Sequence, residues 1–105
     1  MDGARRTYVV LISEEAVQNL LSHARFLAQV SEAAALRLVE EFGEKASSLE
    51  ECPERNPWLS DPLAPSGKYR KLLVGKGYLL IYQMRGSTVY ADVVLDCRQD
   101  YSWLL

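Results

Sequence analysis

Cysteine and histidine are scarce in this chain. Its 105 residues include two cysteines, Cys52 and Cys97, and a single histidine, His23. The two cysteines lie far apart without the spacing of a zinc site, and His23 has no cysteine or second histidine near it in the sequence. We therefore predict no metal site and no cofactor. We expect both cysteines to be reduced thiols and His23 to be an ordinary boundary residue.

Long apolar runs and an excess of basic charge are also missing. No run reaches the roughly 18 apolar residues of a membrane-spanning helix, and residues 1–10 lack the apolar core of a signal peptide. These absences predict a cytoplasmic protein without a membrane partner. The formal net charge is −2, whereas a nucleic-acid-binding domain is typically strongly basic. No Ser-His-Asp set or glycine-rich phosphate loop is present.

The charges that are present are unevenly distributed. Residues 1–53 hold five Lys and Arg against nine Asp and Glu, whereas residues 54–105 hold seven against five. This distribution is typical of solvated helices beside a sheet whose lysines simply reach into solvent, and the alternative is a binding face on the sheet. The length and the 49% apolar fraction predict one domain that spans residues 1–105.

The first half of the chain predicts a strand and a helical hairpin. Tyr8–Ile12 is a continuous β-branched and aromatic run, for which we expect a buried strand. Ser13 and Ser31 are expected N-caps of two helices, the first from Glu14 to about Gln29. Apolar residues at spacings of three and four predict the buried stripes of the two helices: Ala16, Val17, Leu20, Leu21, Ala24, Leu27 and Ala28, then Ala35, Leu38, Val39, Phe42, Ala46 and Leu49.

The second half predicts a loop and an antiparallel meander. All four prolines fall within residues 53–65, where Trp58 and Leu59 are expected to hold the loop to the core. Three β-type runs follow, at 68–74, 78–84 and 88–96, with short glycine-containing links. In the last run we expect Val89, Ala91, Val93 and Leu95 to face the helices, and Tyr90, Asp92, Val94 and Asp96 to face away from them. Tyr78 and Tyr82 are expected to pack under the helices.

The order of these pieces resembles the RelE/ParE superfamily of toxins from type II toxin–antitoxin systems. The matching segments are YVVLIS, the helix start Ser13-Glu14-Glu15-Ala16, an alanine-rich second helix, Pro53-Glu54-Arg55, Tyr69-Arg70-x-Leu72, Gly77-Tyr78-x-x-x-Tyr82 and Arg98-x-Asp100-Tyr101. The resemblance implies an α+β fold of order β-α-α-β-β-β. In this fold a helical hairpin packs on one face of a four-stranded, mostly antiparallel sheet.

The resemblance also implies a site and partners. In a RelE-like nuclease, which cleaves mRNA on the ribosome, Arg70 and Arg98 would hold phosphate oxygens and Tyr101 would orient a base. In either branch of the family, Lys68, Arg70, Arg98 and Tyr101 are the expected binding residues, and a cognate antitoxin is the expected partner. A homodimer is left open.

Acidic residues near this site favour the ParE branch. Asp96 stands where many relatives have a histidine, and Asp100 stands beside Tyr101, where some nucleases have one. With Asp92, these carboxylates would repel an RNA backbone. We therefore predict a ParE-like toxin that binds DNA gyrase. The alternatives are a RelE-like endoribonuclease and a decayed toxin that acts only as a binding partner. The structural alternative for Arg98 is a pair with Asp96 or Asp100, and for Tyr101 it is a cap on the edge of the core.

Overall fold

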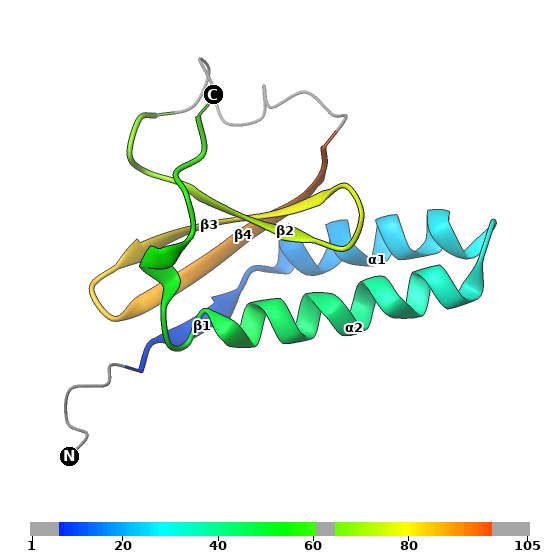
Figure 1. The fold of residues 1–105 in the computed structure, drawn as a ribbon, viewed down its shortest axis with the longest axis horizontal. Coiled ribbons are helices and arrows are strands. Elements are labelled where there is room, and N and C mark those ends of the chain that lie inside the picture. Colours follow the sequence, from blue (N-terminus) through cyan, green and yellow to red (C-terminus); the bar gives the residue numbers. More distant parts are fainter. Residues whose placement is uncertain (1–6, 61–64, 98–105) are drawn as a thin grey trace.

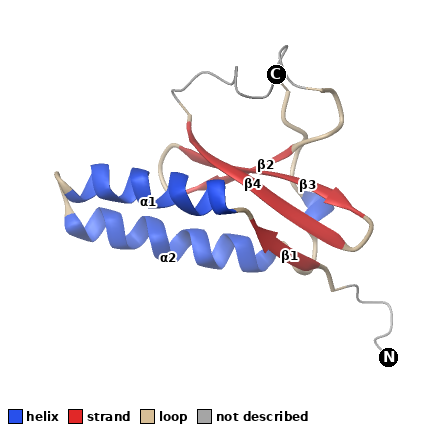
Figure 2. Cartoon of the chain, turned by 180° about the vertical axis from the view of Figure 1, so that it is seen from behind, coloured by secondary structure: helices blue, strands red, loops and turns tan. Residues whose placement is uncertain are grey.

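A computed structural model of the chain describes residues 7–60 and 65–97. Its elements follow the predicted order (Figure 1): β1 (Val9–Ile12), α1 (Glu14–Ala28), α2 (Glu32–Ser48), the 3₁₀ turn η2 (Pro53–Arg55), β2 (Arg70–Val74), β3 (Tyr78–Arg85) and β4 (Thr88–Asp96). The four strands form one mixed sheet, and the two helices run side by side along it (Figure 2). The predicted α+β class is confirmed.

Both helices begin at the predicted caps. The Ser13 hydroxyl oxygen accepts a hydrogen bond from the Ala16 amide at 2.9 Å, and the Ser31 oxygen accepts one from the Ala34 amide at 3.1 Å. Each bond satisfies one of the amides that a helix start leaves without an intrahelical partner. Only Gln29 to Ser31 separate the helices, so α1 and α2 pack as an antiparallel hairpin.

The first strand lies at an edge of the sheet, so the expectation that it is buried was wrong. The strand order is β1-β4-β3-β2, with β1 parallel to β4 and the other pairs antiparallel. Val9 is 56% exposed and Leu11 is 50% exposed, although Tyr8 and Val10 do pack into the core. A strand at the edge has one neighbour only, and an apolar run does not reveal which position in the sheet a strand takes.

A bulge at Asp92 reverses the alternation along β4. Tyr82 lies opposite Ala91, whereas its neighbour Ile81 lies opposite Val93, so Asp92 is an extra residue. Val89 and Ala91 face the helices as predicted, but beyond the bulge the faces are exchanged. Val94 joins the core under the helices, with Asp96 on the same face, while Val93 and Leu95 pack on the other face. The predicted orientation was therefore wrong for these four residues.

The larger core lies between the hairpin and the sheet. Leu20, Leu38 and Phe42 pack there with Tyr78 and Tyr82, which confirms the placement of the two tyrosines. The predicted stripes were too wide, because four of their members are exposed: Val17, Leu21 and Val39 at about 40%, and also Ala28.

A smaller cluster forms on the other face of the sheet. There Leu59 covers Ile81, Val93 and Leu95, so the proline-rich segment is attached to the sheet as expected. Trp58 remains 47% exposed. Across residues 7–60 and 65–97, neither helix has the length and apolar character needed to cross a membrane.

Candidate functional site

Arg70, the first residue of β2, is the centre of a cluster that includes the proline-rich segment. Its Nη1 donates hydrogen bonds to the carbonyl oxygens of Asn56 at 2.6 Å and Glu54 at 3.0 Å. Its guanidinium carbon lies 3.8 Å from the centre of the Trp58 ring, a distance typical of a strong cation–π contact. Two carbonyls and one indole therefore hold this side chain in place.

The backbone beside Arg70 continues the sheet. The Leu59 amide donates to the Tyr69 carbonyl at 2.7 Å, and the Lys71 amide donates to the Pro57 carbonyl at 3.0 Å. These bonds pair Pro57–Leu59 with the outer side of β2, where Trp58 and Arg70 form an isolated antiparallel bridge. Trp58 therefore stacks on the side chain of the residue that it opposes.

Two buried tyrosines donate hydrogen bonds to residues of the turn η2. The Tyr82 hydroxyl donates to the Pro53 carbonyl at 2.5 Å and accepts from the Asn56 side-chain amide at 3.0 Å. The Tyr8 hydroxyl donates to a Glu54 carboxylate oxygen at 2.7 Å. Burial raises the pKa of Tyr82 above its ordinary value, so this phenol stays protonated and keeps its donor.

The structure places the predicted site residues in three situations. Arg70 lies opposite Tyr82, so it belongs to the face of the sheet that carries the helices. Lys68 is exposed, with its ammonium nitrogen 5.2 Å from the centre of the Tyr69 ring. Arg98 and Tyr101 lie outside the described residues, so their convergence with Arg70 stays a prediction.

Sequence reasoning missed the partners of Arg70. Trp58 and Asn56 precede Arg70 by more than ten residues, and no periodic pattern connects a loop residue to the strand that it will join. The available signal was Trp58 itself, because a large aromatic residue in a proline-rich loop must contact some part of the fold. In addition, Nε of Arg70 is buried without a hydrogen-bond partner among the described residues.

The described charges are segregated between the two layers. The sheet and its turns carry the cations Lys68, Arg70, Lys71, Lys76 and Arg85 against the carboxylates Asp92 and Asp96. The described residues that precede them, up to Ser60, carry Arg25, Arg37, Lys45 and Arg55 against Glu14, Glu15, Glu32, Glu40, Glu41, Glu44, Glu50, Glu51 and Glu54. The uneven charge seen along the chain thus becomes a basic sheet beside an acidic hairpin.

The metal-binding residue types, His, Cys, Asp and Glu, do not cluster in the described part of the chain. Residues 7–60 and 65–97 hold no group of three His, Cys, Asp or Glu side chains that could bind a metal ion. Cys52 and Cys97 are both exposed and free, as expected. The His23 ring lies within the fold, where Nε2 is 2.9 Å from the Val94 carbonyl oxygen and the ring centre is 4.9 Å from that of Tyr78.

Comparisons with known proteins agree with this architecture. The family model for the ParE toxin of the type II toxin–antitoxin system parDE matches residues 10–101. A solved structure titled "Chromosomal ParDE TA system from P. aeruginosa" aligns with a TM-score of 0.66 at 11% identity. That alignment covers 84% of this chain and 94% of the other. No curated protein matches significantly. Since the family model covers most of its length, the chain belongs to the ParE toxin family of type II toxin–antitoxin systems.

Proposed function

We propose that this toxin arrests growth in the cytoplasm by binding a target protein, DNA gyrase, and that a cognate antitoxin neutralises it. The family to which the chain belongs supports this proposal, because gyrase is the target that the ParE resemblance implies. The competing activity is cleavage of mRNA, for which a toxin needs cationic side chains free to surround a phosphate.

The contacts of Arg70 favour binding of a target protein over cleavage of mRNA. Its Nη1 is occupied by the carbonyl oxygens of Glu54 and Asn56, and one face of its guanidinium is covered by Trp58. An arginine that clamps a phosphate presents its forked donors to the ligand. Arg70 instead uses Nη1 for two bonds to the backbone, and its buried Nε has no hydrogen-bond partner among the described residues. The bonds of Nη1 suit a structural role and favour a toxin that acts by binding.

Two measurements on the same purified protein test the proposal. We expect it to inhibit supercoiling by gyrase and to leave mRNA intact in a translating extract, as followed by primer extension. Codon-phased cuts with supercoiling unaffected would show a nuclease instead. If the protein neither inhibits supercoiling nor cuts mRNA, and growth after induction is normal, the protein is a decayed toxin.

The antitoxin half of the proposal has its own test. The segregated charge predicts that an acidic and apolar antitoxin segment, extended or helical, covers the sheet and the hairpin. Co-expression with the small open reading frame beside the gene should restore growth and give a complex that purifies intact. A toxin recovered alone, with growth still arrested, would contradict this half.

A further inference from the structure

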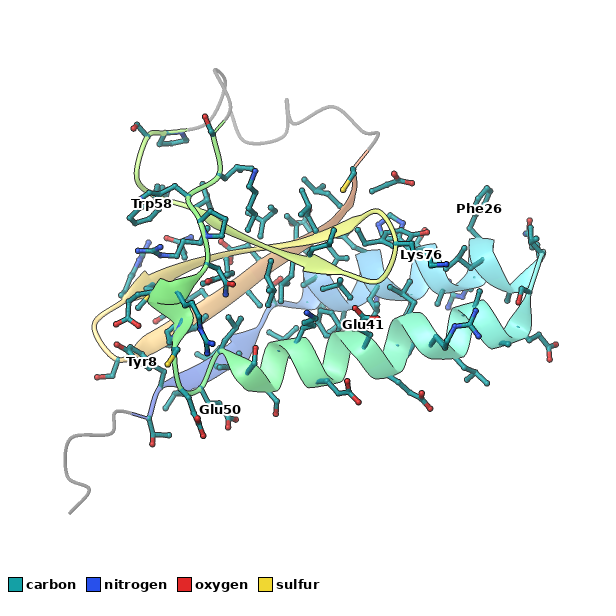
Figure 3. All side chains as sticks on the ribbon, in the orientation of Figure 1. Tyr8, Phe26, Glu41, Glu50, Trp58 and Lys76 are labelled. Carbon is teal, nitrogen blue, oxygen red and sulfur yellow. The ribbon has the colours of Figure 1, made fainter. Side chains whose placement is uncertain are left out.

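Trp58 is a large aromatic side chain that the fold leaves partly in solvent. It is 47% exposed, whereas the next residue, Leu59, is 4% exposed and packs in the smaller cluster. Figure 3 shows Trp58 toward the opposite end of the molecule from Phe26 and the tip of the helical hairpin. The indole is therefore part of the surface, although the backbone that bears it is anchored to the sheet through Leu59.

Arg70 fixes the position of this indole. The two residues oppose each other in an antiparallel bridge, and the backbone on either side of Trp58 is hydrogen-bonded to the chain on either side of Arg70. The guanidinium lies 3.8 Å from the ring centre and is itself fixed by the carbonyl oxygens of Glu54 and Asn56. An aromatic side chain that is already ordered loses little conformational entropy when a partner covers it.

The shape of this surface selects a folded partner. Tryptophan is among the residue types that dominate binding energy at protein interfaces, where such side chains fill well-packed pockets of the partner. An indole that stands on the surface needs a concave site to receive it, and a folded protein presents one. A segment that becomes extended or helical on binding supplies side chains of its own and no pocket. The exposed indole therefore fits the target of the toxin better than its antitoxin.

The charges near Trp58 indicate what surrounds that pocket. Residues 65–91 include five Lys and Arg and no Asp or Glu. Among them Lys68 is exposed and lies two residues before Arg70, the residue that opposes Trp58. The described carboxylate nearest along the chain, Glu54, accepts a hydrogen bond from the Tyr8 hydroxyl. A partner with carboxylates at the rim of an apolar pocket would complement this surface.

We propose that Trp58 is the side chain by which the toxin anchors itself to gyrase. The indole enters an apolar pocket of the enzyme, and carboxylates at the rim of that pocket pair with Lys68. Arg70 is a positioning residue, since it acts by holding the indole in place. This inference rests on the proposed function, because it identifies the surface with which the toxin binds its target.

The test measures two affinities of the full chain, one for purified gyrase and one for the product of the open reading frame beside the gene. Trp58→Ala should weaken gyrase binding about 30-fold or more, the loss expected at an interface hot spot, and should leave antitoxin binding unchanged. Phe26→Ala is the control, because Phe26 is an exposed aromatic residue at the hairpin tip and should affect neither affinity. Wild-type affinity of Trp58→Ala for gyrase would overturn the inference, as would a loss confined to the antitoxin.

Lys68→Glu tests the same surface without touching the packing of the proline-rich segment. It should weaken gyrase binding about 10-fold at low salt and less at high salt, because salt screens exposed charges. Lys76→Glu makes the same charge change at an exposed residue of the β2–β3 turn and should have little effect. Equal losses in the two variants would contradict a site at Trp58. A wild type that does not bind gyrase would overturn the proposed function as well, whereas tight binding by both wild type and Trp58→Ala would overturn this inference alone.

Discussion

Trp58 and Arg70 oppose each other on paired backbone segments, and the guanidinium carbon of Arg70 lies 3.8 Å from the centre of the indole ring. This contact joins a loop residue to the first residue of β2. Together with the bonds from Arg70 to the carbonyl oxygens of Glu54 and Asn56, it attaches the first part of the proline-rich segment to β2. A residue predicted from the family resemblance to bind a ligand therefore has a structural task in this chain.

Removal of the Arg70 side chain should destabilise the protein. Arg70→Ala deletes two charge-assisted hydrogen bonds and a cation–π contact, so we expect a loss of about 2–3 kcal/mol in the free energy of unfolding, measured with urea. Arg85→Ala is the control, because Arg85 is exposed and its own contact, with Tyr90, is longer at 5.7 Å. Equal unfolding midpoints for the two variants would show that Arg70 does not hold the loop.

Phe42 should be essential to the attachment of the hairpin. It is 6% exposed and packs in the core between the helices and the sheet. Phe42→Ala should lower the free energy of unfolding by about 3–5 kcal/mol, a large share of the roughly 5–15 kcal/mol that stabilises a small domain. Val39→Ala, on the same helix at 41% exposure, should cost much less. The measurement is thermal unfolding, and similar shifts in both variants would contradict the observed burial.

Tyr82 should make the protein sensitive to alkaline conditions. Burial raises the pKa of its phenol above the ordinary value of 10.0, so the folded state binds the proton more tightly than the unfolded state. Its contribution to stability is therefore complete below pH 10 and is lost as the pH rises through the higher pKa of the folded state. Denaturant unfolding at a series of pH values should show this decline.

Tyr82→Phe provides the matching variant. It leaves the Pro53 carbonyl without its donor, which should cost about 1–3 kcal/mol at neutral pH. It should also remove part of the alkaline decline. A wild type and a Tyr82→Phe variant whose stabilities fall in parallel above pH 10 would exclude Tyr82 as a source of that decline.

The mechanism can be tested at Arg98 and Tyr101. If the toxin binds gyrase, mRNA should remain intact in cells that express the wild type, Arg98→Ala or Tyr101→Phe, whether or not growth arrest persists. For a nuclease, Arg98→Ala should slow cutting by about 10²-fold or more, the effect of losing one charge stabiliser. Primer extension after induction, beside a supercoiling assay, distinguishes the two. Cuts in mRNA that the wild type makes and that Arg98→Ala does not make would show a nuclease and contradict the proposed binding mechanism.

Much of the local structure could be predicted because its causes are local. A serine followed by glutamates starts a helix through bonds to its own next residues, as Ser13 does with Ala16. Apolar spacing identifies which side of a helix is buried, as for Leu38 and Phe42. Glycine-containing links between β-type runs give the meander, because each turn involves only adjacent residues.

The errors concern how one segment pairs with another. The bulge at Asp92 depends on how β3 and β4 align, so the strand's own alternation gave Val93 and Leu95 the wrong face. In the same way, the edge position of β1 follows from its parallel pairing with β4, at the other end of the chain. Neither relation leaves a signal within the strand concerned.

The helices, the strands and their order follow from the sequence alone, because capping, periodicity and turn chemistry act over a few residues. What the charged side chains do depends on how the elements pack. Packing binds Arg70 to the carbonyl oxygens of Glu54 and Asn56, and it brings Arg37 of α2 and Lys76 of the β2–β3 turn into the lining of one pocket. A charged side chain takes the partner that the packed backbone brings within reach, and that partner lies far away in the sequence.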